Sequence, residues 1–243
     1  VSNCGRNNET GISVEFLVNE TLADVEGVDF LQAATSTIIT FSLNTTLVGN
    51  YNITCYVVPV SGDNRTENNS MSCNVFVRFP TILRVPHDYP TIKEAINNAL
   101  LDDTVLVSGG YYTEGRIDIY KSRITLATDG LVTLDGLDGS DVLNIKADNV
   151  VINGFVIRNA QLYGIKLRGF NNTLMKNTIS DSYCGIYLDR SSNSSITLNN
   201  AKSNLLGILL EASSNNSLVG NNATANTSGI LVNYSPNNVL RDN

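Results

Sequence analysis

The 243-residue chain has little of what metal sites and basic binding surfaces are made from. It contains no tryptophan, one histidine and four cysteines, so a site built on several histidines has almost nothing to use. Charged residues are only 16% of the chain, against an average of about 25%. The net charge is −7, whereas a nucleic-acid-binding protein normally presents a basic face. No apolar run approaches the roughly 20 residues of a membrane-spanning helix. Nucleic-acid binding and a membrane span in this segment are therefore disfavoured.

The four cysteines indicate disulfides rather than a metal site. They stand at positions 4, 55, 73 and 184, a spacing that matches no zinc-binding pattern, and disulfides imply an oxidising compartment. A hairpin that turns around residues 61–64 and pairs symmetrically about position 64 would place Cys55 opposite Cys73. We therefore prefer a Cys55–Cys73 disulfide, with Cys4 bonded to either partner as the alternative. Cys184 is expected to be an unpaired structural thiol.

Residues 1–80 contain short segments of alternating apolar and polar side chains without a helical period. These segments are 12–18, 37–43, 51–60 and 72–79. Strands of this length predict a small antiparallel β-sandwich. Four short pieces of this region resemble the CARDB-type cell-adhesion-related domain, an Ig-like sandwich: Ser2-Asn3-Cys4-Gly5, the strand at 14–18, Gly49-Asn50-Tyr51-Asn52-Ile53 and Glu67-Asn68-Asn69-Ser70. The resemblance implies that the first strand is missing, because a strand should precede Ser2.

A second domain is expected over residues 81–243, beginning with the only good helix pattern. Residues 90–101 predict a helix, because Pro90 stands near its start and Ile92, Ala95 and Ile96 share one face at i, i+3, i+4 spacing. A strand at 104–107 and a Gly-Gly turn at 109–110 are expected to follow.

The remainder of the chain is dominated by an internal repeat of about 22 residues. Gly-Ile recurs at 164, 185, 207 and 229, and asparagine recurs at 149, 171, 193, 215 and 237. A second asparagine column stands at 177, 199, 221 and 243, and an apolar column at 152, 174, 196, 218 and 240. The leucine-rich repeat has a comparable period, but its Leu-x-x-Leu-x-Leu-x-x-Asn spacing is absent.

A repeat of this length with strand-like alternation predicts a right-handed parallel β-helix with three short strands per coil. Its coils would stack about 4.8 Å apart, so that equivalent residues form ladders. We expect asparagines stacked at one corner to hydrogen-bond along the stack, with their backbones in the left-handed turn conformation. The helix at 90–101 would cap the first coil, whose edge would otherwise recruit further strands.

Several motifs in this region also resemble a known superfamily. They are Tyr89-Pro90-Thr91-Ile92, Ile96-Asn97, Asp103-Thr104-Val105-Leu106-Val107 and Tyr111-Tyr112-Thr113-Glu114. They resemble the start of pectin-lyase-like β-helix proteins, and the asparagine-rich coils resemble NosD-like and sugar-hydrolase-associated repeats. The resemblance covers roughly residues 84–243. It implies an all-β fold, while the superfamily mixes lyases, hydrolases, esterases and non-catalytic surface proteins.

The outward positions of the Gly-Ile strands hold the candidate site residues. Asp189 and Glu211 stand on adjacent coils, where their carboxyl groups could approach within about 5–6 Å, as in retaining glycosidases. The alternative, which we favour, is a surface charge ladder in which Arg168 neutralises Asp189, because no second cluster of acids or bases surrounds the pair. An outward binding surface for a glycan or a protein is also expected. Its residues are Lys166, Arg168, Tyr187, Leu209 and Leu231.

One acidic loop could bind a cation. Asp135, Asp138 and Asp141 supply oxygen ligands of the kind that Ca²⁺ prefers, although Asp-Gly is first of all a turn dipeptide. We therefore expect no metal or other cofactor, with Ca²⁺ at this loop as the alternative. His87 is expected to be a solvated loop residue.

Twelve of the 33 asparagines begin an Asn-x-Ser/Thr sequon, a density that suits a secreted glycoprotein. The sequons expected in turns or at coil edges are the better glycosylation candidates: Asn19, Asn44, Asn64, Asn68 and Asn226. Those at Asn171, Asn193 and Asn215 are poorer candidates, because in an inward or corner ladder a glycan would clash with the next coil.

These features predict a non-catalytic extracellular protein of a cell surface, sheath or filament, with adhesion or carbohydrate contact as its activity. The competing hypothesis is a polysaccharide-active enzyme, either a glycoside hydrolase that uses Asp189 and Glu211 or a lyase. The repeat runs to Asn243 without a capping pattern. Further residues of a longer chain, or other subunits, are therefore expected partners, together with glycans.

Overall fold

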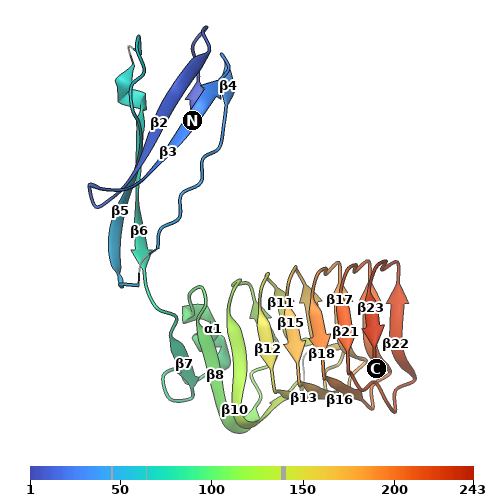
Figure 1. The fold of residues 1–243 in the computed structure, drawn as a ribbon. Coiled ribbons are helices and arrows are strands. Elements are labelled where there is room, and N and C mark those ends of the chain that lie inside the picture. Colours follow the sequence, from blue (N-terminus) through green and yellow to red (C-terminus); the bar gives the residue numbers. More distant parts are fainter. Residues whose placement is uncertain (45, 64, 138–140) are drawn as a thin grey trace. The chain divides into compact units, whose positions relative to one another are not determined.

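The structure is a computed structural model that describes residues 1–44, 46–63, 65–137 and 141–243. The chain divides into two compact units, Val1–Phe79 and Pro80–Asn243. Strands dominate both units (Figure 1). Among the described residues, no helix is long and apolar enough to cross a membrane.

The N-terminal unit is built on a four-stranded antiparallel sheet in the order β3-β2-β5-β6, with β1 and β4 forming a separate pair. The strands are β1 (Ser2–Asn3), β2 (Glu9–Val18), β3 (Thr21–Leu31), β4 (Thr35–Ser36), β5 (Gly49–Val57) and β6 (Ser70–Val77). Ile12, Val14 and Phe16 are buried at alternate positions of β2, as the sequence predicts. The Phe16 ring stacks on Phe41 with a centroid distance of 5.0 Å.

Two features of this unit differ from the sequence prediction. Residues 37–43 form no strand, whereas Thr21–Leu31 forms the long strand β3. A two-residue turn joins β2 to β3, with φ of 50° at Asn19 and 66° at Glu20, as tight hairpins of this twist require. β3 is an edge strand with mostly exposed residues, so it lacks the buried alternation that reveals a strand in a sequence.

The register of the β5–β6 hairpin differs from the symmetric pairing assumed for Cys55 and Cys73. Cys55 lies opposite Met71 and Cys73 lies opposite Ile53, so the two cysteines are not cross-strand partners. The hairpin is one position out of the assumed symmetry, because a single-turn 3-10 helix at Thr66–Asn68 occupies part of the connection. All four cysteines are free thiols in the structure.

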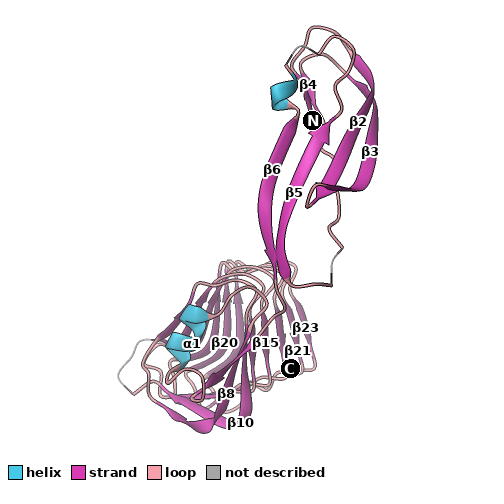
Figure 2. Ribbon diagram, turned by 90° about the vertical axis from the view of Figure 1, so that its left-hand side faces the viewer, coloured by secondary structure: helices cyan, strands magenta, loops and turns pink. Residues whose placement is uncertain are grey.

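The second unit is a parallel β-solenoid with three faces. The first face contains β7 (Ile82–Val85), β8 (Thr104–Tyr112), β10 (Thr125–Asp135), β12 (Val151–Asn153), β15 (Thr173–Met175), β18 (Ser195–Thr197), β21 (Ser217–Val219) and β23 (Val239–Arg241). The second contains the end of β10 with β13 (Val156–Arg158), β16 (Thr178–Ser180) and β19 (Asn200–Lys202). The third contains β9 (Ile117–Ile119), β11 (Asp141–Lys146), β14 (Tyr163–Arg168), β17 (Cys184–Asp189), β20 (Leu206–Glu211) and β22 (Ser228–Asn233). Figure 2 shows strands of successive coils lying one behind another.

The observed register confirms the 22-residue repeat. Ile152 pairs with Leu174, Leu174 with Ile196, and Ile196 with Leu218. All four side chains are fully buried in one continuous core. The Gly-Ile strands pair in the same way, since Ile186 lies between Ile165 and Ile208.

Buried polar ladders run beside this core. The column at 177, 199, 221 and 243 hydrogen-bonds along the stack as expected, but the left-handed backbone falls on the preceding residues, such as Lys176 and Leu198. Asn199 Oδ1 accepts the Asn177 backbone N–H at 3.0 Å, and Asn199 Nδ2 donates to the Leu174 carbonyl at 2.9 Å. The other ladder is offset by one residue from the expected column. Its members are Asn172, Ser194, Asn216 and Asn238. The expected column at 149, 171, 193, 215 and 237 is exposed, with φ between 54° and 60°.

Helix α1 (Ile92–Asn98) is shorter than the expected 90–101. Thr91 is its N-cap and accepts the Glu94 N–H at 3.1 Å, and Ala99 has already left the helical conformation. The buried face of α1 packs against β7, β8 and β9, at the β8 end of the solenoid (Figures 1 and 2).

The expected Gly-Gly turn is absent, because β8 continues through Gly109 and Gly110. A Cβ at Gly109 would lie 3.4 Å from the Leu131 carbonyl oxygen of the next coil. Glycine therefore allows two strands to approach closely here, at a point where the register of β8 and β10 shifts.

Candidate functional site

The outward side chains of the third face form straight columns along the solenoid. In one column Lys166 lies next to Tyr187, which lies next to Leu209 and then Leu231. In the next column Asp189 and Glu211 are register partners on β17 and β20. The structure thus places the expected catalytic alternative and the expected binding surface on one face.

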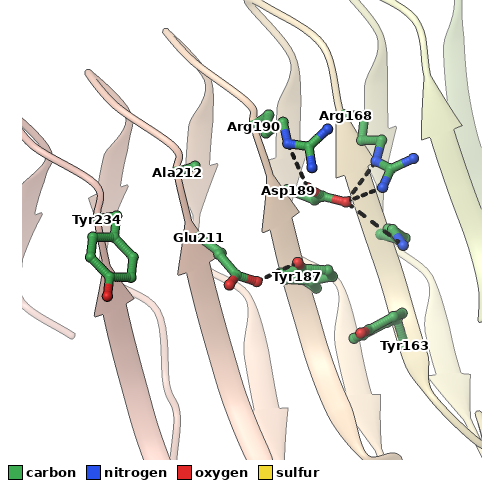
Figure 3. Close-up of a pocket in the computed structure, with 9 residues that line it drawn as sticks. Tyr163, Arg168, Tyr187, Asp189, Arg190, Glu211, Ala212 and Tyr234 are labelled. Carbon is green, nitrogen blue, oxygen red and sulfur yellow. Dashed lines mark hydrogen bonds and ion pairs between the residues drawn. The ribbon is translucent and has the colours of Figure 1, made fainter.

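A depression of about 470 Å³ lies on this face, and we call it the polar hollow (Figure 3). Its lining residues are Tyr163, Lys166, Arg168, Tyr187, Asp189, Arg190, Glu211, Ala212 and Tyr234. Three of the five expected binding-surface residues line it. Leu209 and Leu231 stand in register beside Tyr187 but are not part of the lining.

Asp189 forms the floor of the hollow and is only 6% exposed. Arg168 Nε donates to Asp189 Oδ2 at 2.6 Å, and the Arg168 Nη2 group also contacts this oxygen. Lys166 Nζ and Arg190 Nε each lie 3.8 Å from an Asp189 oxygen. The expected neutralisation of Asp189 by Arg168 is therefore present, and two further cations surround the same carboxylate.

Glu211 lies on the next coil and is exposed. The Tyr187 hydroxyl donates to Glu211 Oε2 at 2.7 Å. Burial and this hydrogen bond raise the pKa of Tyr187 well above its ordinary value. The two acids therefore have different partners, one a set of cations and the other a neutral phenol.

Tyr187 is not the exposed residue that the outward column suggests. It is 7% exposed, and its ring stacks on Tyr163 with a centroid distance of 4.6 Å. The Lys166 ammonium lies 5.0 Å from the Tyr163 ring centroid and 5.4 Å from that of Tyr187. The two rings therefore pack against each other and against the Lys166 ammonium, and they do not present an exposed aromatic face to a ligand.

The accessible rim of the hollow consists of residues that the sequence prediction partly missed. The Arg190 side chain is 79% exposed, and Tyr234 is 91% exposed. Glu211 completes this rim. Tyr163 could have been found from its column, since it is the register partner of Cys184. Tyr234 could also have been found from the repeat, since it stands one 22-residue step after Ala212 and two after Arg190, and all three have a left-handed backbone.

The expected calcium ligands do not act as one group. Asp135 ends β10 and is buried, and its carboxylate accepts Arg158 Nε at 2.9 Å and the Tyr111 hydroxyl. Burial pushes the pKa of Asp135 upward, but its hydrogen bonds outweigh this and hold the pKa below its usual value. Asp138 lies outside the described residues.

Asp141 begins β11 and is 6% exposed. Burial raises its pKa, and its Oδ1 atom has no hydrogen-bond partner among the described residues. In the described part of the chain, no group of three or more His, Cys, Asp or Glu side chains is arranged to hold a metal ion.

His87 is exposed to solvent, whereas Cys184 is buried. His87 is 81% exposed, and its Nδ1 lies 2.7 Å from Asp88 Oδ1. Cys184 is fully buried, its Sγ contacts the Ile186 carbonyl at 3.3 Å, and burial raises its pKa to about 12.

The fold resembles that of solved polysaccharide-active enzymes. The crystal structure of pectate lyase Pel9A matches with a TM-score of 0.54 and 17% identity, over 60% of this chain and 48% of that chain. This chain therefore spans about half the length of the lyase, and at this identity the likeness shows the right-handed parallel β-helix fold alone. A Yersinia enterocolitica family 28 exopolygalacturonase matches with a TM-score of 0.29 and 10% identity, over 96% of this chain and 69% of that chain, which carries no weight. No curated protein sequence gives a significant match.

A family model described as "Periplasmic copper-binding protein (NosD)" matches residues 96–243. Copper is bound in proteins by cysteine, methionine and histidine. The matched segment contains no histidine, one methionine and only the buried Cys184 as a thiol. The donor set of this segment therefore does not fit copper.

The family model covers more than half of the chain. Its extent also agrees with the observed solenoid, whose coils run from β8 to β23. This chain therefore belongs to the NosD family of parallel β-helix proteins.

Proposed function

We propose that this chain is a non-catalytic surface module that contacts polysaccharide at the polar hollow. The observation that carries the proposal is the environment of Asp189, whose carboxylate is buried and held by Arg168 with Lys166 and Arg190 nearby. A carboxylate held in this way is neither a free nucleophile nor a free base. It instead fixes three cationic side chains around a depression.

The rim residues supply the contacts that a sugar chain requires. Glu211 and Arg190 are exposed acceptors and donors for sugar hydroxyl groups. Tyr234 offers an exposed aromatic ring, which combines an apolar face with a polar tip. The column geometry also repeats along the solenoid axis, so an extended chain of sugars could follow it.

The rest of the molecule supports a surface role. We propose that the N-terminal unit is an Ig-like, CARDB-type adhesion domain, to which its antiparallel sheet corresponds. Helix α1 serves as the cap of the solenoid, because its buried face joins the core next to β7 and β8. An exported location follows the periplasmic description of the NosD family. The partners are then glycans and other surface proteins or further parts of a longer chain, and no cofactor is needed.

Calorimetric titration of the full chain with plant and microbial polysaccharides tests the binding site. For a polysaccharide that binds, we expect Tyr234→Ala and Glu211→Gln each to weaken binding about tenfold, which corresponds to about 1.4 kcal/mol. Tyr183→Ala is the matched control, because Tyr183 is 46% exposed and does not line the hollow. Unchanged affinity in both rim variants would refute the proposed site.

The competing function is a glycoside hydrolase that uses Asp189 and Glu211, favoured by their positions on adjacent coils. Assays for new reducing ends and for unsaturated products on the same polysaccharides separate the two functions. We expect neither product. Turnover that Glu211→Gln abolishes would overturn the non-catalytic assignment.

A further inference from the structure

We propose that Asn171, Asn193 and Asn215, the corner asparagines, are N-glycosylation acceptors, and that neighbouring corners do not carry glycans on the same molecule. The sequence pattern predicts that these residues lie inside a ladder, where they would be poor acceptors. The structure places them outside the ladder, so the reason for excluding them no longer holds. The inference is independent of the polar hollow.

The corner asparagines share one environment on three successive coils. All three are exposed and have a left-handed backbone, with φ of 56°, 54° and 58°. Their backbone N–H groups donate to carbonyls of the following coil at 3.1–3.3 Å. Their side-chain amides make no hydrogen bond with the described residues. The peptide backbone is thus fixed, while the amide that accepts a glycan is left free.

The second half of each sequon is equally available. The hydroxyl residues are Thr173, Ser195 and Ser217, the first residues of β15, β18 and β21. Each is half-buried on the outward side of its strand, and its hydroxyl makes no hydrogen bond with the described residues. Each sequon therefore presents both its amide and its hydroxyl group in one fixed geometry.

Asn226, an expected acceptor, has the opposite environment. Its Oδ1 accepts the Asn204 backbone N–H at 2.8 Å, and its Nδ2 donates to the Ala201 carbonyl at 2.7 Å. A glycan on Nδ2 would break the ladder that joins these two coils. Asn19 is engaged only through its oxygen, because its Oδ1 accepts the Asn52 N–H at 2.8 Å while its Nδ2 makes no hydrogen bond with the described residues. Asn64 lies outside the described residues.

The stacking of coils limits how many corners can be occupied together. Thr173, Ser195 and Ser217 are direct register partners, so adjacent corners are about 4.8 Å apart. A substituted pyranose ring is wider than this spacing. Asn171 and Asn215 lie two coils apart, at about twice that distance. The allowed patterns are therefore a glycan on any one corner, or glycans on Asn171 and Asn215 together.

The modification requires a lipid-linked oligosaccharide as its donor. The Asn Nδ2 atom forms a bond to the anomeric carbon of the first sugar, and the bond from that carbon to the lipid phosphate oxygen breaks. The amide nitrogen loses one proton, and the lipid phosphate departs as the leaving group. The protein contributes only the exposed amide and its neighbouring hydroxyl.

Secretion of the full chain from a cell that performs N-glycosylation, followed by intact-mass and glycopeptide analysis, tests the inference. We expect glycans at the corner asparagines and none at Asn226, and no intact chain with glycans on two adjacent corners. The variant Asn193→Gln should increase the fraction of molecules that carry glycans on both Asn171 and Asn215. Thr173→Ala should remove the glycan at Asn171 alone, while Thr173→Ser should keep it.

Circular dichroism serves as the control that each variant folds like the parent chain. Exposed Asn44 serves as the internal reference for a working glycosylation system. Occupied Asn226, or corners that stay bare while Asn44 is modified, would overturn the acceptor assignment. Single molecules with glycans on Asn171 and Asn193 together would overturn the alternation.

Discussion

Asn199 shows how one side chain joins three coils of the solenoid. It is 1% exposed, accepts from Asn177, and donates to the Leu174 carbonyl and to Asn221 Oδ1 at 2.9–3.0 Å. Asparagine suits this position because its amide carries both acceptor and donor groups. Apolar side chains of the core cannot hydrogen-bond to the backbone N–H and C=O groups of these turns. The asparagine ladder supplies those hydrogen bonds.

Replacement of Asn199 by alanine should therefore destabilise the solenoid strongly. We expect a loss of about 3 kcal/mol in the free energy of unfolding, because a buried N–H and a buried C=O lose their partners. Asn193→Ala is the matched control on the exposed column, with an expected loss of about 1 kcal/mol from its left-handed backbone. Urea denaturation measures both, and equal losses would show that the ladder bonds are not what stabilises the coils.

Cys184 should be unreactive while the chain is folded. Burial raises the pKa of its thiol to about 12 from an ordinary value of 9.0. At pH 8 the thiol is therefore protonated, and its burial also keeps it from reagents. The stability that goes with the protonated thiol is present below pH 9 and is lost as the pH rises towards 12. Alkylation at pH 8 with mass analysis should label exposed Cys4 and Cys73 and leave Cys184 free. Rapid labelling of Cys184 under native conditions would contradict its placement.

The Gly-Ile strands depend on glycine because adjacent coils approach closely there. A Cβ at Gly185 would lie 2.7 Å from the Gly207 carbonyl oxygen and 3.1 Å from Ala201 Cβ. We expect Gly185→Ala to destabilise the fold by about 1–3 kcal/mol, as overpacking does. At Gly229 the nearest atom would be 3.2 Å away, so Gly229→Ala should have a smaller effect. Chemical denaturation compares the two, and a larger loss at Gly229 would be inconsistent with this explanation.

At the level of elements, the sequence predicts what repeats and misses what occurs once. Leu174 and Ile196 recur at a fixed step, and that step alone gives the strand register that the structure shows. The edge strand Thr21–Leu31 has no repeat and no buried alternation, so its hairpin is not predicted. The expected helix is too long because Ala99 turns away to let Leu100 donate to Asp103.

The candidate site was also predictable where its residues recur in columns and not where they depend on side-chain packing. The columns identify Arg168 and Asp189 as neighbours, and their ion pair follows from that. The burial of Tyr187 does not follow, because it depends on the stacking of two long side chains rather than on strand position. The repeat places Tyr234 in one column with Arg190 and Ala212, but the position of this column at the rim of the hollow is seen only in three dimensions.

At the scale of the whole molecule, the two units have very unequal cores. The N-terminal unit has a small cluster of buried apolar residues, Ile12, Val14 and Leu31, whereas the solenoid core is continuous from Leu83 to Leu218. We expect two transitions in calorimetric unfolding, with the N-terminal unit melting first. Val14→Ala should lower only the first transition and Ile186→Ala only the second. A single transition that both variants shift equally would show that the units unfold together.

The central claim is that the polar hollow binds polysaccharide without cleaving it. Hydrogen exchange on the full chain, with and without the polysaccharide that binds best in titration, tests this most directly when the same samples are assayed for products. We predict slower exchange confined to the strands that carry the hollow, Tyr163–Arg168, Cys184–Asp189 and Leu206–Glu211, and to the rim residues Arg190, Ala212 and Tyr234, with no product formed. Protection on the other two faces only, or accumulation of cleaved polysaccharide, would contradict the claim.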